Sequence, residues 1–279
     1  MHKVILAKSA GFCFGVKRAV EMAVAALDQG NLPVYTLGPI IHNPQEVDRL
    51  QEMGIRMARG LEEISEGTVV IRSHGAPMGV IEEAELRGLT VVDATCPLVN
   101  CLKERVRQLA ENGYQVIIVG ESDHPEVKAV VSYDPDSCLV TRGIDELDPS
   151  RFGKKVGVVA QTTQSLSTLQ SVASACISRC RETRVYNTIC IATHKRSAEA
   201  LELSRNVDVM VIVGGKNSAN TTRLARELAW DGSTTYHIES AEEIGDLQIG
   251  DGAVIGITAG ASTPGWVITE VVEALENLD

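Results

Sequence analysis

The sequence predicts an α/β protein of three lobes, related by a pseudo-threefold repeat and each built on a mostly parallel sheet. Three observations carry this prediction. Short β-branched runs alternate with amphipathic helical stretches. A strand followed by a cysteine occurs three times, and a glycine loop follows each of these cysteines at a nearly constant distance. Repetition of this kind indicates repeated structural units.

The strand and helix candidates alternate along the whole chain. The strand candidates are Val4–Leu6, Pro33–Thr36, Val69–Ile71, Thr90–Val92, Gln115–Val119, Val156–Val159, Arg184–Tyr186, Val209–Val213 and Ala253–Ile257. The amphipathic segments include Val16–Asp28, Leu98–Asn112 and Lys195–Asn206. Because parallel strands need long crossovers that are usually helical, this alternation favours parallel sheets.

The repeat is clearest in its cysteines and glycines. Cys13, Cys96 and Cys190 each follow a predicted strand and lie 83 and 94 residues apart. The glycines that follow them, 25, 24 and 24 residues later, are Gly38, Gly120 and Gly214. Each unit therefore reads strand, cysteine, helix, strand, glycine loop, helix, strand and polar loop.

Three such units fit the length, with lobes at residues 14–96, 97–190 and 191–279. The third unit ends without a closing strand, and the first strand has no unit of its own. We therefore expect residues 1–13 to complete the third sheet. Because parallel strands present their carboxyl ends to ligands, a pseudo-threefold arrangement would aim the three cysteines at one point.

Composition limits the classes of ligand and location. The 279 residues carry 26 Lys and Arg against 37 Asp and Glu, a net charge of −11. This acidic balance and the few aromatic residues argue against nucleic-acid binding. No apolar run approaches the ~20 residues that cross a bilayer, and the first apolar run is too short for a signal peptide. We therefore expect a cytoplasmic protein that binds no membrane, with any anionic ligand held by a local cluster of donors.

The three repeated cysteines suggest a metal site that has no fourth protein ligand. In a reducing compartment, ligation, catalysis and burial are the roles available to them. Three thiolates at one point suit a soft metal or an iron–sulfur cluster, and the repeat supplies no fourth ligand for a structural zinc. The spacing alone leaves zinc and a cluster both open. The cysteines without counterparts, which we interpret as small buried hydrophobes, are Cys101, Cys138, Cys176 and Cys180.

Polar side chains follow the strand ends in all three units. They are His42, His74, His124, Ser218, Asn220 and Ser262. Backbone N–H groups at helix starts favour anions, so these loops together would make a donor-rich site for a phosphate or diphosphate. Taken singly, each serine or asparagine is an ordinary helix cap, and each histidine an ordinary loop residue.

Glu126 follows His124 and Pro125 at the predicted start of a helix. The simple interpretation is a first-turn glutamate stabilised by the helix dipole. The functional interpretation is a carboxyl group with a raised pKa that donates a proton, with Thr162 as a relay.

Nine motifs occur in an order that is specific to one family. They are AGFCFGVKRAV, GPIIHNPQEV, RSHG, DATCPLV, HPEV, AQTTQS, NTICIAT, GGKNSAN and TAGAST. From Gly11 to about Pro264 the chain resembles the 4-hydroxy-3-methylbut-2-enyl diphosphate reductases. These are the LytB-type iron–sulfur oxidoreductases that end the non-mevalonate isoprenoid pathway.

The resemblance implies three lobes around a central [4Fe-4S] cluster, one per chain, with an open iron site. It implies reductive dehydroxylation of the allylic alcohol diphosphate to isopentenyl and dimethylallyl diphosphate, with electrons from a ferredoxin or flavodoxin. The metal ligands would be Cys13, Cys96 and Cys190. The residues matching the substrate site are His42, His74, His124, Thr162, Ser218, Asn220 and Ser262, and those matching the catalytic groups are Glu126, Thr162 and His124.

Two other functions compete with the reductase. A non-catalytic module of the same fold would keep a three-cysteine metal or cluster site, but it would need neither Glu126 nor Thr162. A hydrolase or transferase acting on phosphate esters would need no convergent thiolates.

Overall fold

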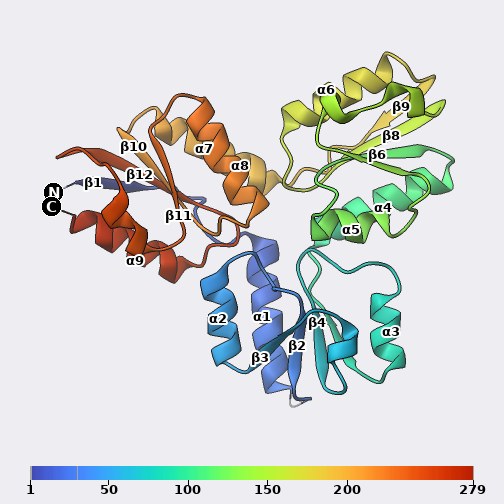
Figure 1. Cartoon of the computed structure of the whole chain (residues 1–279), viewed down its shortest axis with the longest axis horizontal. Coiled ribbons are helices and arrows are strands. Elements are labelled where there is room, and N and C mark those ends of the chain that lie inside the picture. The colour runs from blue at the N-terminus through green and yellow to red at the C-terminus, as the bar shows by residue number, and fades with distance from the viewer. Residues whose placement is uncertain (1, 30, 279) are drawn as a thin grey trace. The chain divides into compact units, whose positions relative to one another are not determined.

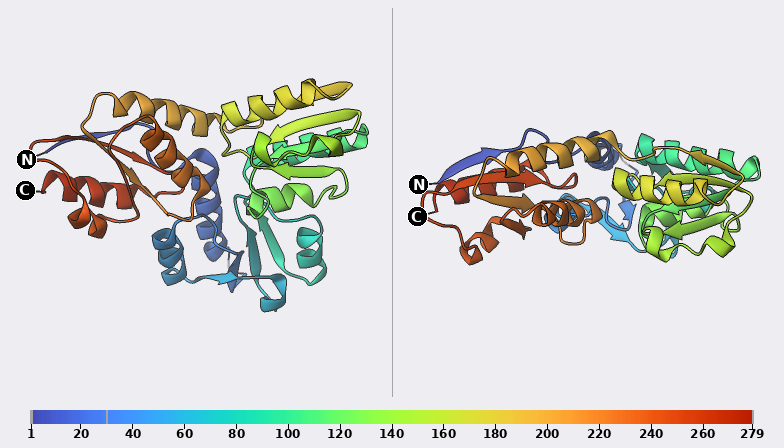
Figure 2. Two further views of the ribbon diagram at one scale, coloured as in Figure 1. Left: turned by 45° about the horizontal axis from the view of Figure 1, so that its top comes forward. Right: turned by 90° about the horizontal axis from the view of Figure 1, so that it is seen from above.

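The computed structural model describes residues 2–29 and 31–278, and its contacts divide the chain into two compact units. Unit 1 comprises Met1–Lys17, Ile41–Met53 and Ile191–Asp279, and unit 2 comprises Arg18–Ile40 and Gly54–Cys190. The described residues form three parallel four-stranded sheets with helices between the strands (Figure 1 and Figure 2). The predicted α/β class is confirmed, whereas the lobe boundaries 14–96, 97–190 and 191–279 stay predictions.

Strands and helices alternate along the chain. The strands are β1 (Lys3–Leu6), β2 (Val34–Leu37), β3 (Ile55–Ala58), β4 (Thr68–Ile71), β5 (Thr90–Asp93), β6 (Gln115–Val119), β7 (Cys138–Thr141), β8 (Lys155–Ala160), β9 (Glu182–Val185), β10 (Val209–Val213), β11 (Thr235–Ile238) and β12 (Val254–Ala259). The helices are α1 (Phe14–Asp28), α2 (Pro44–Glu52), α3 (Val80–Leu86), α4 (Pro97–Glu111), α5 (Pro125–Val131), α6 (Leu166–Ile177), α7 (Ile191–Ser204), α8 (Ala219–Trp230) and α9 (Gly265–Glu276). None of these helices has the length and hydropathy needed to span a membrane.

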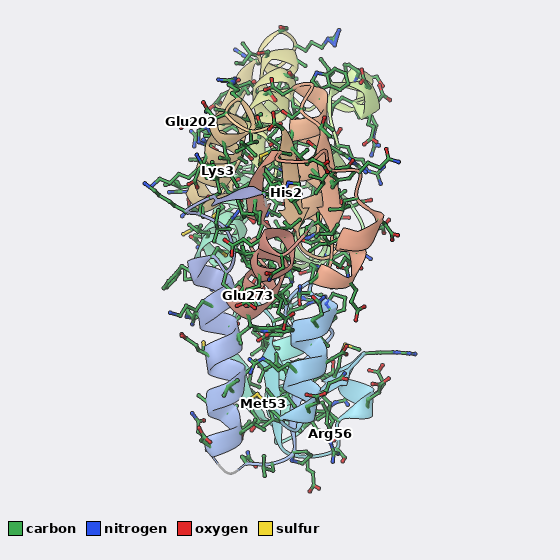
Figure 3. All side chains as sticks on the ribbon, turned by 90° about the vertical axis from the view of Figure 1, so that its left-hand side faces the viewer. His2, Lys3, Met53, Arg56, Glu202 and Glu273 are labelled. Atoms are coloured by element: carbon green, nitrogen blue, oxygen red, sulfur yellow. The ribbon has the colours of Figure 1, made fainter. Side chains whose placement is uncertain are left out.

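All three sheets have the same strand order. Sheet A of unit 1 runs β1-β12-β10-β11, while sheets B and C of unit 2 run β3-β2-β4-β5 and β7-β6-β8-β9. The strand that leads into a repeated cysteine lies at an edge each time: β1 beside β12, β5 beside β4, and β9 beside β8. The register of sheet A aligns Lys3 with Val254, and the exposed Lys3 marks the beginning of this edge strand (Figure 3). The N-terminal strand thus takes the edge position that the third unit lacks.

Helices cover both faces of sheet C. On β8, Val156 and Val158 pack with α6, whereas Val159 packs with α4 and α5. Figure 1 shows α6 on one side of this sheet and α4 and α5 on the other. A strand buried on both faces is apolar at consecutive positions, which explains the continuous apolar runs in β6 and β8.

Helices also cover both faces of sheet A. On β10, Val211 and Val213 pack with α9, while Met210 and Ile212 pack with α7 and α8. The carboxyl ends of the strands in each sheet carry the loops that hold the cysteines and polar residues.

The structure adds an edge strand to each predicted unit. These strands are β3, β7 and β11, and each lies at the end of its sheet opposite the cysteine-bearing edge. Each has four residues, of which one or two are fully buried. Such short runs have little apolar alternation by which they could be found in the sequence. The predicted helix at Lys195–Asn206 also begins earlier, at Ile191.

Replacing Gly157 with alanine is expected to destabilise unit 2. A Cβ atom at Gly157 would lie 2.5 Å from the side chain of Leu109 of α4, so that buried side chain must shift from its packed position. Overpacking of this kind costs about 1–3 kcal/mol. Chemical unfolding measures the loss, with Gly153→Ala as the control, because a Cβ at Gly153 would make only an ordinary 3.5 Å contact. Equal unfolding midpoints for both variants would contradict the close packing of α4 on β8.

Candidate active site

Each repeated cysteine donates its backbone N–H to the polar loop beside it. The three bonds join Cys13 to the carbonyl of Ala261 (3.2 Å), Cys96 to Ser73 (2.9 Å) and Cys190 to Thr162 (2.9 Å). In each case the accepting residue either is, or directly precedes, a predicted substrate-binding residue. The sequence repeat therefore extends to a repeated hydrogen bond that ties each cysteine to a polar loop.

The cysteines differ in their environment, and the expectation of burial is wrong for Cys101, which is exposed. Cys13, Cys96 and Cys190 are half-buried, at loops that follow edge strands. Burial raises the pKa of Cys138 to about 12, helped by the charge of Asp134, and raises that of Cys176 to about 11. Because the thiolate is the form that binds metals, burial disfavours ligation by these two thiols. Their assignment as packing residues agrees with this environment.

Glu126 and Thr162 lie together in unit 2. The carboxylate of Glu126 accepts two hydrogen bonds from Thr162, one from the backbone N–H (2.7 Å) and one from the hydroxyl (2.8 Å). Glu126 is 2% exposed and Thr162 is 7% exposed. Burial raises the pKa of Glu126, while the bonds from Thr162 and the charge of Lys103 oppose the rise. A buried carboxyl group of this kind keeps its proton to a higher pH than an exposed glutamate.

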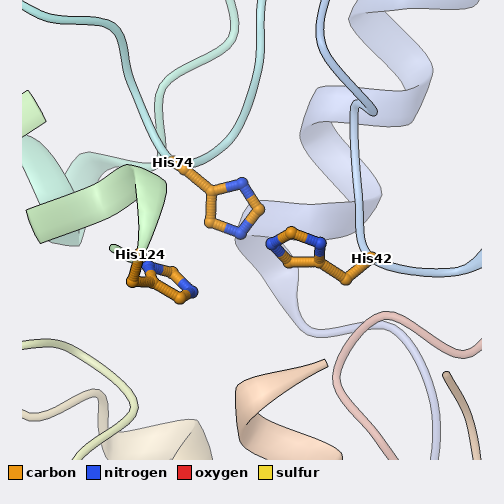
Figure 4. A group of neighbouring side chains, drawn as sticks. All are labelled: His42, His74 and His124. Carbon is orange, nitrogen blue, oxygen red and sulfur yellow. The ribbon is translucent and has the colours of Figure 1, made fainter. Parts of the chain in front are cut away.

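His124 caps the helix that carries Glu126. Its backbone is extended before Pro125, which occupies the first helical position, and its Nδ1 accepts the backbone N–H of Glu126 (3.2 Å). In the neutral ring the proton therefore sits on Nε2. The rings of His124 and His74 meet edge to face with centroids 5.4 Å apart, and Figure 4 labels both rings. Unit 2 thus brings Glu126, Thr162, His124 and His74 into one neighbourhood.

Lys103 is a member of this neighbourhood that the sequence did not indicate. Its side chain is buried, and its Nζ donates to the carbonyl of Ala76 (3.5 Å). Burial lowers the pKa of Lys103, and the negative charges of Asp93 and Glu126 oppose that effect. The only signal in the sequence is a lysine between apolar residues on the inner face of α4.

A cavity of about 350 Å³ borders the loop that presents His74. Arg72 and Gly75, which lie on either side of His74 in the sequence, both line it. Burial lowers the pKa of Arg72. The His74 loop therefore runs beside open space within unit 2.

Three predicted substrate residues lie together in unit 1. Ser218 caps α8, and its Oγ lies 3.4 Å from the Oγ of Ser262. The Ser262 hydroxyl donates to the carbonyl of His42 (3.1 Å). Ser218 and Ser262 are both buried. Ser218 and Ser262 follow β10 and β12 at the carboxyl end of sheet A, and Ser218 lies at the start of a helix, where anions are favoured.

Asn220 is the fourth predicted substrate residue of unit 1. It is 6% exposed, and its Nδ2 has no hydrogen-bond partner among the described residues. A buried donor without a partner costs about 1–3 kcal/mol. This orphaned donor indicates a place where a ligand oxygen would bind.

A glycine is required at the end of β10. Gly214 has φ +142°, and a Cβ there would lie 2.4 Å from the hydroxyl of Thr263. That hydroxyl donates to the carbonyl of Val213 (2.9 Å). The repeated glycine therefore lets the loop after β12 pack against the end of β10, next to Ser262 in the sequence.

The comparisons with known proteins agree with one another. A family model described as "LytB protein" matches residues 4–276. The 4-hydroxy-3-methylbut-2-enyl diphosphate reductase of Pelobacter propionicus is 51% identical over 270 residues, covering 97% of this chain and 96% of the relative. A solved (E)-4-hydroxy-3-methyl-but-2-enyl diphosphate reductase, described as the terminal enzyme of the non-mevalonate pathway, is 44% identical with a TM-score of 0.76 over all of both chains. A Plasmodium falciparum reductase structure is 25% identical with a TM-score of 0.90, covering 99% of this chain and 88% of that one.

Proposed function

Because this chain belongs to the LytB family of 4-hydroxy-3-methylbut-2-enyl diphosphate reductases, we propose that it catalyses the last step of the non-mevalonate isoprenoid pathway. The substrate would be 4-hydroxy-3-methylbut-2-enyl diphosphate. Two electrons and two protons would cleave its C–O bond, releasing water and yielding isopentenyl and dimethylallyl diphosphate. A small-molecule diphosphate is thus the ligand that the polar loops would hold.

We propose that Cys13, Cys96 and Cys190 hold one [4Fe-4S] cluster per chain. The donor set fits such a group, because thiolates are the usual ligands of iron–sulfur clusters and three of them leave one iron open. Each cysteine follows the corresponding edge strand of its sheet, and this position and the repeated bond of each backbone N–H support a common role. When bound, the cluster would supply a Lewis-acidic iron and a route for single electrons.

The residues of the polar loops would bind the diphosphate. In unit 1, Ser218, Ser262 and the unpartnered amide of Asn220 offer hydrogen-bond donors near the start of α8. His42 belongs to the same unit, and His74 and His124 of unit 2 would complete the set. Holding the diphosphate lets binding energy orient the distant reacting carbon.

Glu126 would hold the proton that the reaction consumes. Its raised pKa makes the protonated carboxyl available, and the hydroxyl of Thr162 lies within hydrogen-bond distance to relay it. His124 orients the first turn of the helix that carries Glu126 by accepting its backbone N–H.

A ferredoxin or a flavodoxin would supply the electrons one at a time. These are soluble carriers, so the proposal includes a cytoplasmic location. Neither nucleic acid nor a membrane has a part in this reaction.

The repeated bond from each cysteine to a polar loop is the observation that carries the proposal. The test is analysis of iron and acid-labile sulfide in protein purified without oxygen, followed by addition of substrate and a low-potential reductant. We expect about four irons and four sulfides per chain, since this is the cluster that three thiolates with an open iron imply. One zinc without sulfide would refute the proposal, as would a complete cluster without turnover.

Replacing Asn220 with alanine is expected to weaken substrate binding. The variant removes a buried donor that has no partner among the described residues, so it loses little in the free protein and one bond in the complex. A hydrogen bond to a charged group contributes ~1.5–3 kcal/mol, so KM should rise about tenfold or more. Steady-state kinetics measure this change, with Asn206→Ala, an exposed asparagine just beyond α7, as the control. An unchanged KM would remove Asn220 from the site.

A further inference from the structure

Arg196 of α7 binds the loop that leads from β1 into Cys13. Its Nε donates to the carbonyl of Ser9 (3.0 Å), and its Nη2 donates to the carbonyl of Gly11 (2.8 Å). The side chain is 3% exposed, so these bonds are shielded from water. A planar guanidinium can hold two carbonyls at once, which a lysine cannot do in the same geometry.

Glu199, one turn later on α7, binds backbone N–H groups of the same loop. Its two carboxylate oxygens accept the N–H of Lys8 (2.7 Å) and the N–H of Ser9 (2.8 Å). Hydrogen bonds to charged groups are stronger than neutral ones. Arg196 and Glu199 together therefore hold both donors and acceptors of one short segment, which we name the Cys13 loop (residues 8–11).

The Cys13 loop has more need of such support than the segments before the other two cysteines. Cys13 lies seven residues beyond the end of β1, whereas Cys96 and Cys190 lie three and five residues beyond β5 and β9. Gly11 has φ +95°, and a Cβ there would lie 3.0 Å from Ile268. The loop is thus irregular and closely packed, and it is fixed by charged side chains rather than by a strand.

We infer that Arg196 and Glu199 are positioning residues for the Cys13 thiolate. This inference rests on the proposed function, because it concerns Cys13 as a cluster ligand. Neither side chain touches the reacting atoms. They fix the backbone of residues 8–11, and that backbone sets where the thiolate of Cys13 lies.

The test compares two variants with two matched controls on the protein purified without oxygen. Arg196→Gln and Glu199→Gln remove the charge from each contact, and Glu199→Gln keeps the side-chain size. The control Arg223→Gln removes a partly buried arginine of α8 that pairs with Glu227 and donates to the hydroxyl of Ser197 on α7, so it tests whether loss of any arginine contact to α7 has the same effect. The control Glu202→Gln changes an exposed glutamate on α7, labelled in Figure 3.

Three measurements are made on all four variants. They are the rate of iron release to a chelator, the EPR spectrum after reduction, and the hydrogen exchange of the amides of Lys8 and Ser9. For the two loop variants we expect iron release about tenfold faster, as loss of one charge-assisted contact implies, with a changed EPR spectrum and faster exchange. Both controls should match the wild type.

Two outcomes would overturn the inference. One is that Glu199→Gln keeps the wild-type iron release and EPR spectrum while the amides of Lys8 and Ser9 exchange faster. The Cys13 loop would then have become more mobile without any effect on Cys13 as a cluster ligand. The other is equal acceleration of iron release in Glu202→Gln. Wild-type protein without iron would refute the proposed function instead. Alkylation of Cys13 would still test the positioning, since the two variants should then react faster than the controls.

Discussion

Replacing Glu126 with glutamine is expected to lower kcat by about 10²–10⁴-fold, the range that a positioned proton donor contributes. Glutamine keeps the size of the side chain and can still accept from Thr162, but it has no proton to give. Iron content and KM should stay near the wild-type values, because Glu126 lies in neither the proposed ligand set nor the diphosphate group. Single-turnover and steady-state kinetics with a low-potential reductant measure the loss.

The control for this variant is Glu121→Gln, which changes an exposed glutamate in the loop before α5. It should keep full activity. If Glu126→Gln also turned over at the wild-type rate, the proton would have to come from another group, and Lys103 is a buried candidate nearby.

The expected pH dependence of activity and of stability follows from the raised pKa of Glu126. Burial raises the pKa of Glu126, so its protonated carboxyl group is present below that pKa and is lost as pH rises through it. The folded state binds this proton more tightly than the unfolded state does. The wild type should therefore lose stability relative to Glu126→Gln as pH increases from about 4.3, the ordinary glutamate value, through the raised one. Unfolding measured over this range checks the sign.

Replacing Cys96 with serine is expected to reduce cluster content and activity together. The serine oxygen is a harder ligand than the thiolate that iron–sulfur clusters use. Even changes outside the direct ligands of a metal cost ~10–100-fold in affinity or activity, so loss of a ligand should exceed about tenfold. Iron and sulfide analysis and visible absorbance measure the change.

Cys101→Ser is the matched control, because Cys101 is an exposed cysteine on the same helix that begins after Cys96. It should retain iron and activity. An intact cluster in Cys96→Ser would instead remove this cysteine from the ligand set.

The central strands of the fold could be predicted because burial on both faces makes them continuously apolar. Residues 209–213 were found with their correct bounds for this reason. The edge strands β3, β7 and β11 were not found, because each is a four-residue run with only one or two buried residues and no repeated cysteine follows it, as one follows the edge strands β1, β5 and β9. The internal repeat predicted that the first strand completes the third sheet, because the third unit would otherwise lack a strand, and the structure adds that it lies at the edge.

The candidate residues could be predicted because each follows a strand end in a repeated pattern. What the pattern could not supply is the contact between particular side chains. Glu126 and Thr162 are 36 residues apart, and only the packing of α5 beside β8 brings them together. Arg196 and Glu199 could not be found either, since a charged residue on a helix usually faces solvent.

The pairing of β1 with β12 sets the order in which the molecule can be completed during synthesis. Cys13 is synthesised long before its hydrogen-bond acceptor, Ala261, and before β12 (Val254–Ala259), the partner of β1. At ~5–20 residues per second, the nascent chain carries Cys13 for many seconds before sheet A can close. Sheets B and C need no residue beyond Val185 to form their strands. Completion of the Cys13 site therefore waits until β12 and the loop after it have been synthesised, and a chain truncated before β12 would lack the acceptor that holds the Cys13 backbone in place.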